Sequence, residues 1–200
     1  MSAEKGEHLV VIGGDAAGMS AASQARRMRP DLQITAFEAG PHTSYGACGR
    51  PYYGEGLVEK AEDLITRAPQ VFRERYDIDA RVLHRVERID LEKKAVLVHD
   101  LQGERTFWQE YDQLLIATGA VPIRPKLPGI DAEGIHSLSL IPDGVRIRKQ
   151  IEERSPQRAV VVGGGYIGLE MVEALVAQGL EVSLVELLPQ VMATLDGDMA

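Results

Sequence analysis

The 200-residue chain contains a single cysteine, Cys48, so an internal disulfide is excluded. The five histidines are scattered along the chain, and a Cys/His metal site is not expected. The formal net charge of −8 disfavours a nucleic-acid-binding surface. No apolar run approaches the roughly 20 residues that span a membrane, and the N-terminus has no basic start followed by an apolar region. These absences favour a protein of the reducing cytoplasm that binds neither nucleic acid nor membrane.

The chain contains the same short succession of predicted elements twice. Leu9–Ile12 and Ala159–Val162 are apolar, β-branched runs of the length expected for buried parallel strands. Each is followed by a glycine-rich turn, a helical stretch and a second strand. That second strand ends in Glu38 in the first copy and in Glu186 in the second. This is a βαβ unit with an acid about 20 residues beyond the glycines, which is the pattern of a dinucleotide-binding site.

The glycines of such a turn let the backbone approach a pyrophosphate, and the helix N-terminus adds a positive dipole end. The second turn fits G-x-G-x-x-G at Gly163, Gly165 and Gly168. In the first turn Gly13 and Gly18 fit, whereas Asp15 stands where the middle glycine is expected. Either the Asp15 side chain turns outward or this copy is weakened. Two units favour two bound dinucleotides; the alternative is a pair of structural turns in a protein that binds one nucleotide.

The sequence between the copies alternates apolar and polar residues. It predicts a three-stranded antiparallel meander that ends in a buried strand, Gln113–Ala117. Prolines and glycines over residues 117–130 then break regular structure. A helix is expected at residues 143–154, leading into the second copy. We therefore place a domain boundary between residues 1–141 and residues 142–200.

These features together resemble the FAD-dependent pyridine nucleotide–disulfide oxidoreductases over essentially the whole chain. The segments that carry the resemblance are GGDAAGMSAA, SYGACGRPYY, YDQLLIATGA and GGGYIGLE. They are most similar to the single-cysteine branch, which contains coenzyme A-disulfide reductases, NADH oxidases, NADH peroxidases and persulfide or polysulfide reductases. In coenzyme A-disulfide reductases the first glycine motif also often lacks its middle glycine, which makes Asp15 a tolerable departure.

The resemblance implies an α/β fold with two Rossmann-like dinucleotide-binding domains and the antiparallel meander in the first. Residues 1–141 would bind FAD, and residues 142–200 would be the first half of an NAD(P)H-binding domain. Family members continue with the rest of that domain, a return segment of the FAD domain and a dimerisation domain. The full-length protein is therefore expected to be a homodimer, and the 200-residue chain alone is expected to bind FAD poorly and to lack turnover.

The resemblance also implies two sets of cofactor-binding residues. The FAD set is Gly13, Gly14, Ala16, Ala17, Gly18, Glu38, Val86 (through its backbone), Ala117, Thr118 and Gly119. The set for the reduced nicotinamide cofactor is Gly163, Gly165, Tyr166, Ile167, Gly168, Glu170 and Glu186. Glu186 favours NADH because a carboxylate there repels a 2′-phosphate, although NADPH is left open. Tyr166 would cover the flavin and Glu170 would lie near the nicotinamide; packing on a helix is the alternative for both.

Cys48 has no second cysteine five residues to either side, so the internal redox pair C-x-x-x-x-C is absent. The resemblance implies that Cys48 is catalytic and cycles with an external partner, either a small thiol as a mixed disulfide or oxygen as a sulfenic acid. An inert buried cysteine is the alternative. Gly49 and Pro51 favour a helix start directly after Cys48, where the helix dipole would stabilise a thiolate. Arg50 adds a positive charge near the thiol.

The first predicted helix carries a polar stripe on one face. Its members are Ser20, Gln24 and Arg27. They are either a solvated surface or, by resemblance, the positions that contact coenzyme A, where Arg27 suits an ADP phosphate. Ser44 also matches a substrate position. Two matches fail, because Ala47 replaces an asparagine and Tyr76 replaces a lysine, although Arg75 is adjacent.

The predicted function is an NAD(P)H-dependent flavin disulfide reductase that acts on coenzyme A disulfide or on a coenzyme A persulfide or polysulfide. In the mechanism that the resemblance implies, NADH reduces FAD, FAD reduces the Cys48 mixed disulfide, and the thiolate attacks fresh substrate. Two alternatives stay open. One is an NADH oxidase or peroxidase that uses a Cys48 sulfenic acid, and the other is a non-catalytic redox-sensing flavoprotein.

Overall fold

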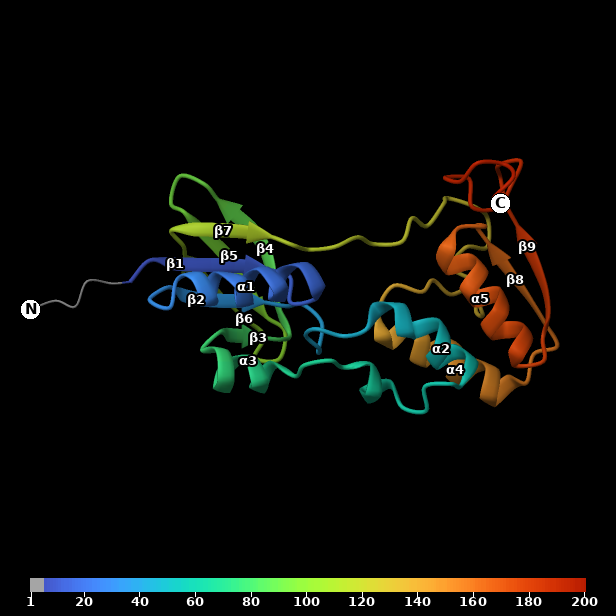
Figure 1. Ribbon diagram of the computed structural model, residues 1–200, viewed down its shortest axis with the longest axis horizontal. Coiled ribbons are helices and arrows are strands. Elements are labelled where there is room, and N and C mark those ends of the chain that lie inside the picture. Colours follow the sequence, from blue (N-terminus) through green and yellow to red (C-terminus); the bar gives the residue numbers. More distant parts are fainter. Residues whose placement is uncertain (1–5) are drawn as a thin grey trace, which may run out of the picture. The chain divides into compact units, whose positions relative to one another are not determined.

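The computed structural model describes residues 6–200 and divides by its internal contacts into two compact units (Figure 1). The first unit holds the described residues up to Tyr45 together with Ile65–Ala120. The second holds Gly46–Leu64 and Val121–Ala200, so the segment around Cys48 belongs to it. This division by contacts differs from a division at residue 141, and the assignment of domains by cofactor stays a prediction.

A four-stranded parallel sheet forms the centre of the first unit. In spatial order its strands are β3 (Asp79–Arg81), β2 (Gln33–Phe37), β1 (His8–Ile12) and β7 (Gln113–Ile116). Helix α1 (Ala16–Met28) connects β1 to β2 and lies across the sheet (Figure 1). Val10 and Val11 are fully buried, so the buried strand predicted for the first copy is confirmed. The burial predicted for β7 is wrong: β7 is an edge strand, and Ile116 is 59% exposed.

Neighbouring residues of a strand point to opposite faces of the sheet. Other elements pack on each face of the four-stranded sheet. On one face, Val11 and Ile34 pack with Met19 of α1 and Phe72 of α3 (Pro69–Tyr76). On the other face, Val10 packs with Val96 and Val98 of the antiparallel meander. The meander consists of β4 (His84–Asp90), β5 (Ala95–Asp100) and β6 (Arg105–Glu110). Its prediction from the alternating pattern is confirmed.

The second unit contains the second βαβ element and the helices that follow Cys48. Its elements are η1 (Ala47–Gly49), α2 (Arg50–Glu55), η2 (Ala61–Leu64), α4 (Ile141–Arg154), β8 (Arg158–Val162), α5 (Tyr166–Ala177) and β9 (Glu181–Val185). Helix α4 begins at Ile141 rather than at residue 143. The Asp143 carboxylate accepts backbone N–H groups of Ser139 (2.9 Å) and Leu140 (2.8 Å), which caps the helix there.

Strands β8 and β9 pair in parallel, as the sequence predicts, but the burial expected of Ala159–Val162 is wrong. Val160 is 65% exposed and Val162 is 79% exposed. The reason is that this sheet has only two strands and that α5 packs against it. In the part of the chain that the structure describes, the other side stays uncovered.

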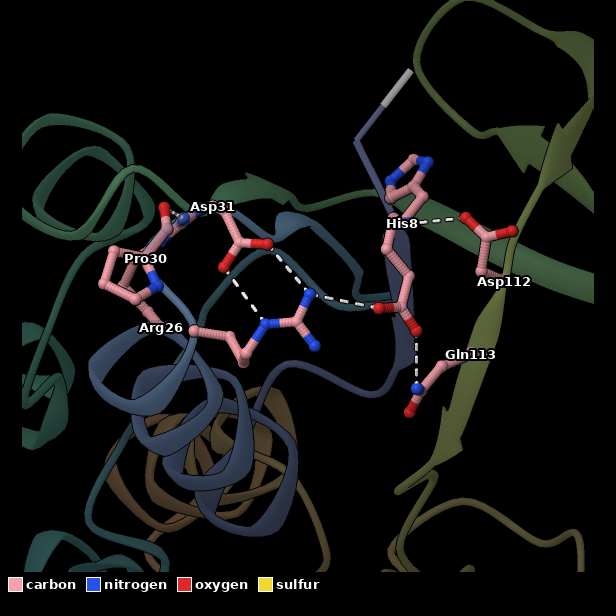
Figure 2. Close-up of polar contacts among 8 residues, drawn as sticks. His8, Arg26, Pro30, Asp31, Asp112 and Gln113 are labelled. Carbon is pink, nitrogen blue, oxygen red and sulfur yellow. Dashed lines mark hydrogen bonds and ion pairs between the residues drawn. The ribbon is translucent and has the colours of Figure 1, made fainter. Parts of the chain in front are cut away.

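Charged side chains tie together the amino-terminal edge of the first sheet (Figure 2). Arg29, just after α1, pairs with Asp31 at 2.8 Å and with Glu7 at 3.1 Å. This pairing raises the pKa of Arg29 and lowers the pKa of Asp31. The backbone N–H of His8 donates to the Asp112 carboxylate at 2.7 Å. This bond joins the start of β1 to the segment before β7. The opposite, carboxyl edge of the sheet is the one that carries the glycine turn.

Candidate functional site

The first glycine turn joins β1 to α1 in a conformation that requires glycine. Gly13 has φ +108°, and a Cβ added there would lie 2.1 Å from the Ala117 carbonyl oxygen. A Cβ at Gly18 would lie 1.9 Å from the Gly13 carbonyl oxygen. The helix start and the end of β7 can approach the turn this closely only because both residues lack side chains.

Glu38, at the end of β2, holds this turn in place. Its carboxylate accepts the N–H of Gly14 at 2.7 Å and the N–H of Gly40 at 2.6 Å. Each carboxylate oxygen retains a further lone pair, so Glu38 can also accept a hydrogen bond from a ribose hydroxyl. Gly40 was missed from the sequence, because its contact depends on how the chain bends after β2.

Asp15 is directed away from the turn by the loop that follows β2. Its carboxylate accepts the backbone N–H of Tyr45 at 3.2 Å, and the residue itself is the N-cap of α1. Ala16 and Ala17 begin α1 and are exposed, so the amino end of the helix stays accessible. The replacement of the middle glycine thus adds a contact between the turn and the loop that contains Ser44.

The other predicted FAD residues follow β7 or lie in β4. The Ala117 N–H donates to the Ile12 carbonyl at 2.7 Å, which places Ala117 beside the glycine turn and Thr118 and Gly119 directly after it. Val86 lies in β4, and its side chain packs against the meander core. Open α/β sheets bind ligands outside the carboxyl ends of their strands, and the glycine turn, Ala117 and Glu38 meet at that edge.

The second glycine turn repeats the geometry of the first. Gly163 has φ +108°. A Cβ at Gly168 would lie 1.9 Å from the carbonyl oxygen of Gly163. The Glu186 carboxylate accepts the N–H of Leu188 at 2.9 Å and that of Gly164 at 2.6 Å. These two backbone N–H groups hold the pKa of Glu186 below its ordinary value. Gly164 was missed from the sequence, although Gly14 of the other copy occupies the matching place.

The amino end of α5 is open to a ligand. A Cβ at Gly165 would meet no atom within 4 Å, so the backbone there can approach a phosphate. Tyr166 is 64% exposed and Ile167 is 50% exposed. Glu170 is half-buried in the next turn of the helix. The residues present therefore fit a dinucleotide at this turn.

Cys48 is exposed, which argues against an inert buried thiol. It lies in η1, and α2 begins at Arg50 with Gly49 as its N-cap, so the predicted helix start is confirmed. The Arg50 Nε donates to the Ala47 carbonyl at 2.7 Å and closes the turn around the cysteine. A Cβ at Gly49 would lie 2.5 Å from a terminal methyl of Leu64, so a larger residue there would displace that side chain.

The helix after Cys48 is attached to α4 and to the segment after α5. Arg148 of α4 donates to the carbonyls of Val58 (3.2 Å) and Glu59 (3.1 Å). Its guanidinium also stacks on the Tyr53 ring at 4.8 Å from the centroid. Gln178, after α5, donates to the Glu55 carbonyl. The cysteine segment and the helix that carries Tyr166 therefore belong to one compact unit.

The predicted coenzyme A residues meet in a cavity of about 160 Å³ in the first unit. Its lining is Met19, Ser20, Ser23, Arg27, Ser44, Arg67 and Phe72. Three of the four predicted residues are thus brought together, namely Ser20, Arg27 and Ser44. Gln24 does not line the cavity; its Oε1 instead accepts from Nε of Arg27 at 3.1 Å. Arg67 was missed, because no spacing in the sequence connects it to the stripe on α1.

A larger hollow of about 410 Å³ lies at the amino-terminal end of the same sheet. Its charges are already paired, since Arg26 contacts Asp77 at 3.3 Å and Arg81 contacts Asp79 at 2.6 Å. We therefore assign it a structural role. Within residues 6–200, no cluster of three or more His, Cys, Asp or Glu side chains could hold a metal ion. None of the helices in that range is both long and apolar enough to cross a membrane.

Comparison with known proteins decides the family. Residues 7–200 match the family described as pyridine nucleotide-disulphide oxidoreductase. The chain belongs to this family. Membership confirms the resemblance drawn from the glycine motifs and the cysteine segment, and it implies FAD and NAD(P)H as cofactors.

Three oxidoreductases illustrate the likeness. The CoA-dependent NAD(P)H sulfur oxidoreductase of Pyrococcus abyssi is 41% identical over 88% of the chain and 39% of its own length. The NADH oxidase of Methanocaldococcus jannaschii is 36% identical over 96% of the chain and 43% of its own length. The crystal structure of reduced Bacillus anthracis CoADR-RHD superposes with a TM-score of 0.95 at 38% identity, covering 98% of the chain and 35% of that structure. The two Rossmann-like units are thereby confirmed, and the chain spans less than half the length of these relatives.

Proposed function

We propose that the protein is an NAD(P)H-dependent flavin disulfide reductase that acts on coenzyme A disulfide, or on a coenzyme A persulfide or polysulfide, through Cys48. The observation that supports this most is the cavity in which Ser20, Arg27 and Ser44 meet. The CoA-dependent activity in the name of the Pyrococcus abyssi relative agrees with it. In this proposal the first glycine turn binds FAD, and the second binds the nicotinamide cofactor.

The chemistry assigned to Cys48 is thiol–disulfide exchange. Its thiolate attacks one sulfur of the acceptor, the acceptor's S–S bond breaks, and one thiolate leaves while a mixed disulfide forms. Two electrons then cleave the mixed disulfide, which releases the second thiolate and restores the Cys48 thiolate. FAD, when bound, supplies the electron path from the nicotinamide cofactor to this sulfur. The exposure of Cys48 gives a large acceptor access to the thiol.

The coenzyme and the assembly belong to the same proposal. The Glu186 carboxylate favours NADH over NADPH, because it would repel a 2′-phosphate and can bind a ribose diol. Tyr166 is exposed and Glu170 is half-buried on the first turns of α5, where a nicotinamide cofactor would contact them. The full-length protein is proposed to be a cytoplasmic homodimer that binds no nucleic acid and no membrane.

The substitution Cys48→Ser in the full-length protein tests the proposal. We expect anaerobic NADH oxidation with coenzyme A disulfide to fall at least about a thousandfold, because the serine hydroxyl cannot exchange with a disulfide. NADH-dependent reduction of an artificial dye acceptor should persist, which shows that the cofactor sites are intact. Unchanged turnover with disulfide acceptors would remove Cys48 from catalysis.

An NADH oxidase or peroxidase is the second candidate, and the Methanocaldococcus jannaschii relative favours it. In that case peroxide would oxidise the exposed Cys48 thiolate to a sulfenic acid, and reduction would return it to thiolate and water. Product analysis separates the two candidates, since the reductase releases free thiol from its acceptor. Mass spectrometry of the purified protein adds a second test, because a coenzyme A adduct on Cys48 supports the reductase.

A further inference from the structure

Two arginines from separate elements face the cavity beside α1. Arg27 comes from α1 itself, and Arg67 comes from the segment between η2 and α3. We propose that Arg67 is a further substrate-binding residue and that, with Arg27, it selects acceptors that carry a phosphate. This inference rests on the proposed function, and it adds the residue that makes the cavity specific for a phosphorylated thiol carrier.

The backbone of Arg67 is fixed from both sides. Its N–H donates to the Ser44 carbonyl at 3.1 Å, and its carbonyl accepts the hydroxyl of buried Thr43 at 3.0 Å. The neighbouring Thr66 N–H donates to the same Ser44 carbonyl at 2.8 Å. Arg67 is therefore held beside Ser44 although the two lie far apart in the sequence.

Ser44 occupies a conformation that non-glycine residues seldom adopt, with φ +49°. Besides the two bonds to its carbonyl, its N–H donates to the Gly14 carbonyl at 3.0 Å. The first glycine turn, Ser44 and Arg67 thus form one hydrogen-bonded chain. A left-handed residue held by three backbone hydrogen bonds indicates that the geometry of this loop is maintained by its surroundings.

The Arg67 side chain lies over the Tyr76 ring, with its guanidinium carbon 5.4 Å from the ring centroid. Tyr76 packs on the core of the first unit, so the position of its ring is fixed. The cation–π contact with this ring stabilises the position of the Arg67 guanidinium. By resemblance Tyr76 replaces a lysine, and Arg75 is adjacent to it in the sequence. The structure instead places Arg67 at that ring and in the cavity lining, and Arg75 is not among the lining residues.

The lining of the cavity suits a phosphate group. It offers two guanidiniums and three serine hydroxyls over Met19 and Phe72, and no acidic side chain is among the seven residues. Guanidinium groups bind phosphate oxygens in a bidentate manner, and hydroxyls add further donors. Arg27 is steadied by Gln24, whose Oε1 accepts two of its N–H groups. The carrier recognised here is therefore a phosphorylated one, as coenzyme A is, rather than a neutral or carboxylate-bearing thiol.

The test compares two arginine variants of the full-length protein, Arg67→Met and the matched control Arg75→Met on the exposed side of α3. With coenzyme A disulfide, we expect Arg67→Met to raise KM about tenfold with little change in kcat. With pantethine, which lacks phosphate, KM should be the same for both variants and for the wild type. Arg67→Lys should recover part of the loss, because it restores the charge without the planar fork.

A binding measurement separates this inference from the proposed function. Adenosine 3′,5′-bisphosphate, titrated calorimetrically, should bind the wild type and Arg75→Met alike and Arg67→Met about tenfold more weakly. If disulfide turnover is absent but this pattern holds, the reductase proposal fails and the phosphate site stands. If the wild type does not bind the probe, or if Arg67→Met and Arg75→Met behave alike in both assays, the inference is overturned.

Discussion

At the scale of single residues, the same carboxylate contact occurs in both units. Glu38 and Glu186 each end a strand, and each accepts the N–H of the second residue of its glycine turn. A carboxylate placed there both shapes the turn and presents oxygens to a ribose. These residues should therefore contribute to stability as well as to cofactor binding.

The substitution Glu186→Gln should lower the stability of the full-length protein at neutral pH, because it removes the charge that the Leu188 and Gly164 N–H groups stabilise. The folded-state pKa of Glu186 lies below its ordinary value, so the wild-type advantage is present above about pH 4.5, the ordinary value. It should be lost as the pH falls through the lowered pKa. Thermal melts of both proteins between pH 7 and about pH 3 measure this difference.

Glu181→Gln is the matched control for that series, since Glu181 is an exposed carboxylate at the start of the same strand. Its melting temperature should follow the wild type across the whole pH range. A Glu186→Gln deficit that is constant with pH, or that grows as the pH falls, would contradict the assigned contact.

At the scale of secondary-structure elements, the Cys48 segment is attached to α4 as well as to α5. Arg148 donates to the carbonyls of Tyr53, Val58 and Glu59, and its guanidinium stacks on the Tyr53 ring. Nη1 is the donor in all of these bonds, and the flat face of the guanidinium is left to stack on the ring. The orientation of α2, and with it the turn that holds Cys48, should therefore respond to changes at this arginine.

The substitution Arg148→Met should destabilise the packing of α2 against α4 by about 1 kcal/mol, since it removes charge-assisted hydrogen bonds at a partly exposed position. Hydrogen exchange of the amides in residues 52–60 should become faster in the full-length protein. Lys149→Met is the control, because Lys149 makes only an exposed ion pair with Glu153. Equal exchange in the two variants would show that Arg148 does not hold this segment.

At the scale of the whole molecule, the described chain leaves apolar strand surface uncovered in both units. Ile116 of β7 is exposed in the first unit, and Val160 and Val162 of β8 are exposed in the second. The relatives are more than twice as long, since the chain covers 39% to 43% of their length. Uncovered apolar strand surface of this kind is where further structure packs.

The 200-residue chain by itself should therefore bind FAD weakly and show no turnover, in contrast to a full-length protein that purifies yellow. Its exposed apolar strands should also bind the dye ANS more strongly per residue than the full-length protein does. Absorbance at the flavin maximum and dye fluorescence measure the two effects. A yellow, active 200-residue chain would disprove the expectation.

Local patterns in the sequence determined the two βαβ units and the glycine turns. The third glycine of each turn is required by a contact with the first, as between Gly18 and Gly13, and the first is favoured by its positive φ. The acids at the strand ends follow from the same spacing, and so does the helix start after Cys48. Such features depend on backbone conformation and strand periodicity, which a single sequence expresses directly.

Only the tertiary structure decided which distant residues share a site. Arg67 reaches the cavity through its bonds to Ser44 and Thr43, and the cysteine segment joins α4 and α5 through Arg148 and Gln178. The exposure of β8 was likewise beyond the sequence, because burial depends on what covers a strand and not on its composition. Long-range contacts of this kind produce no periodic pattern in the sequence, so only the folded chain shows Arg67 beside Ser20, Arg27 and Ser44.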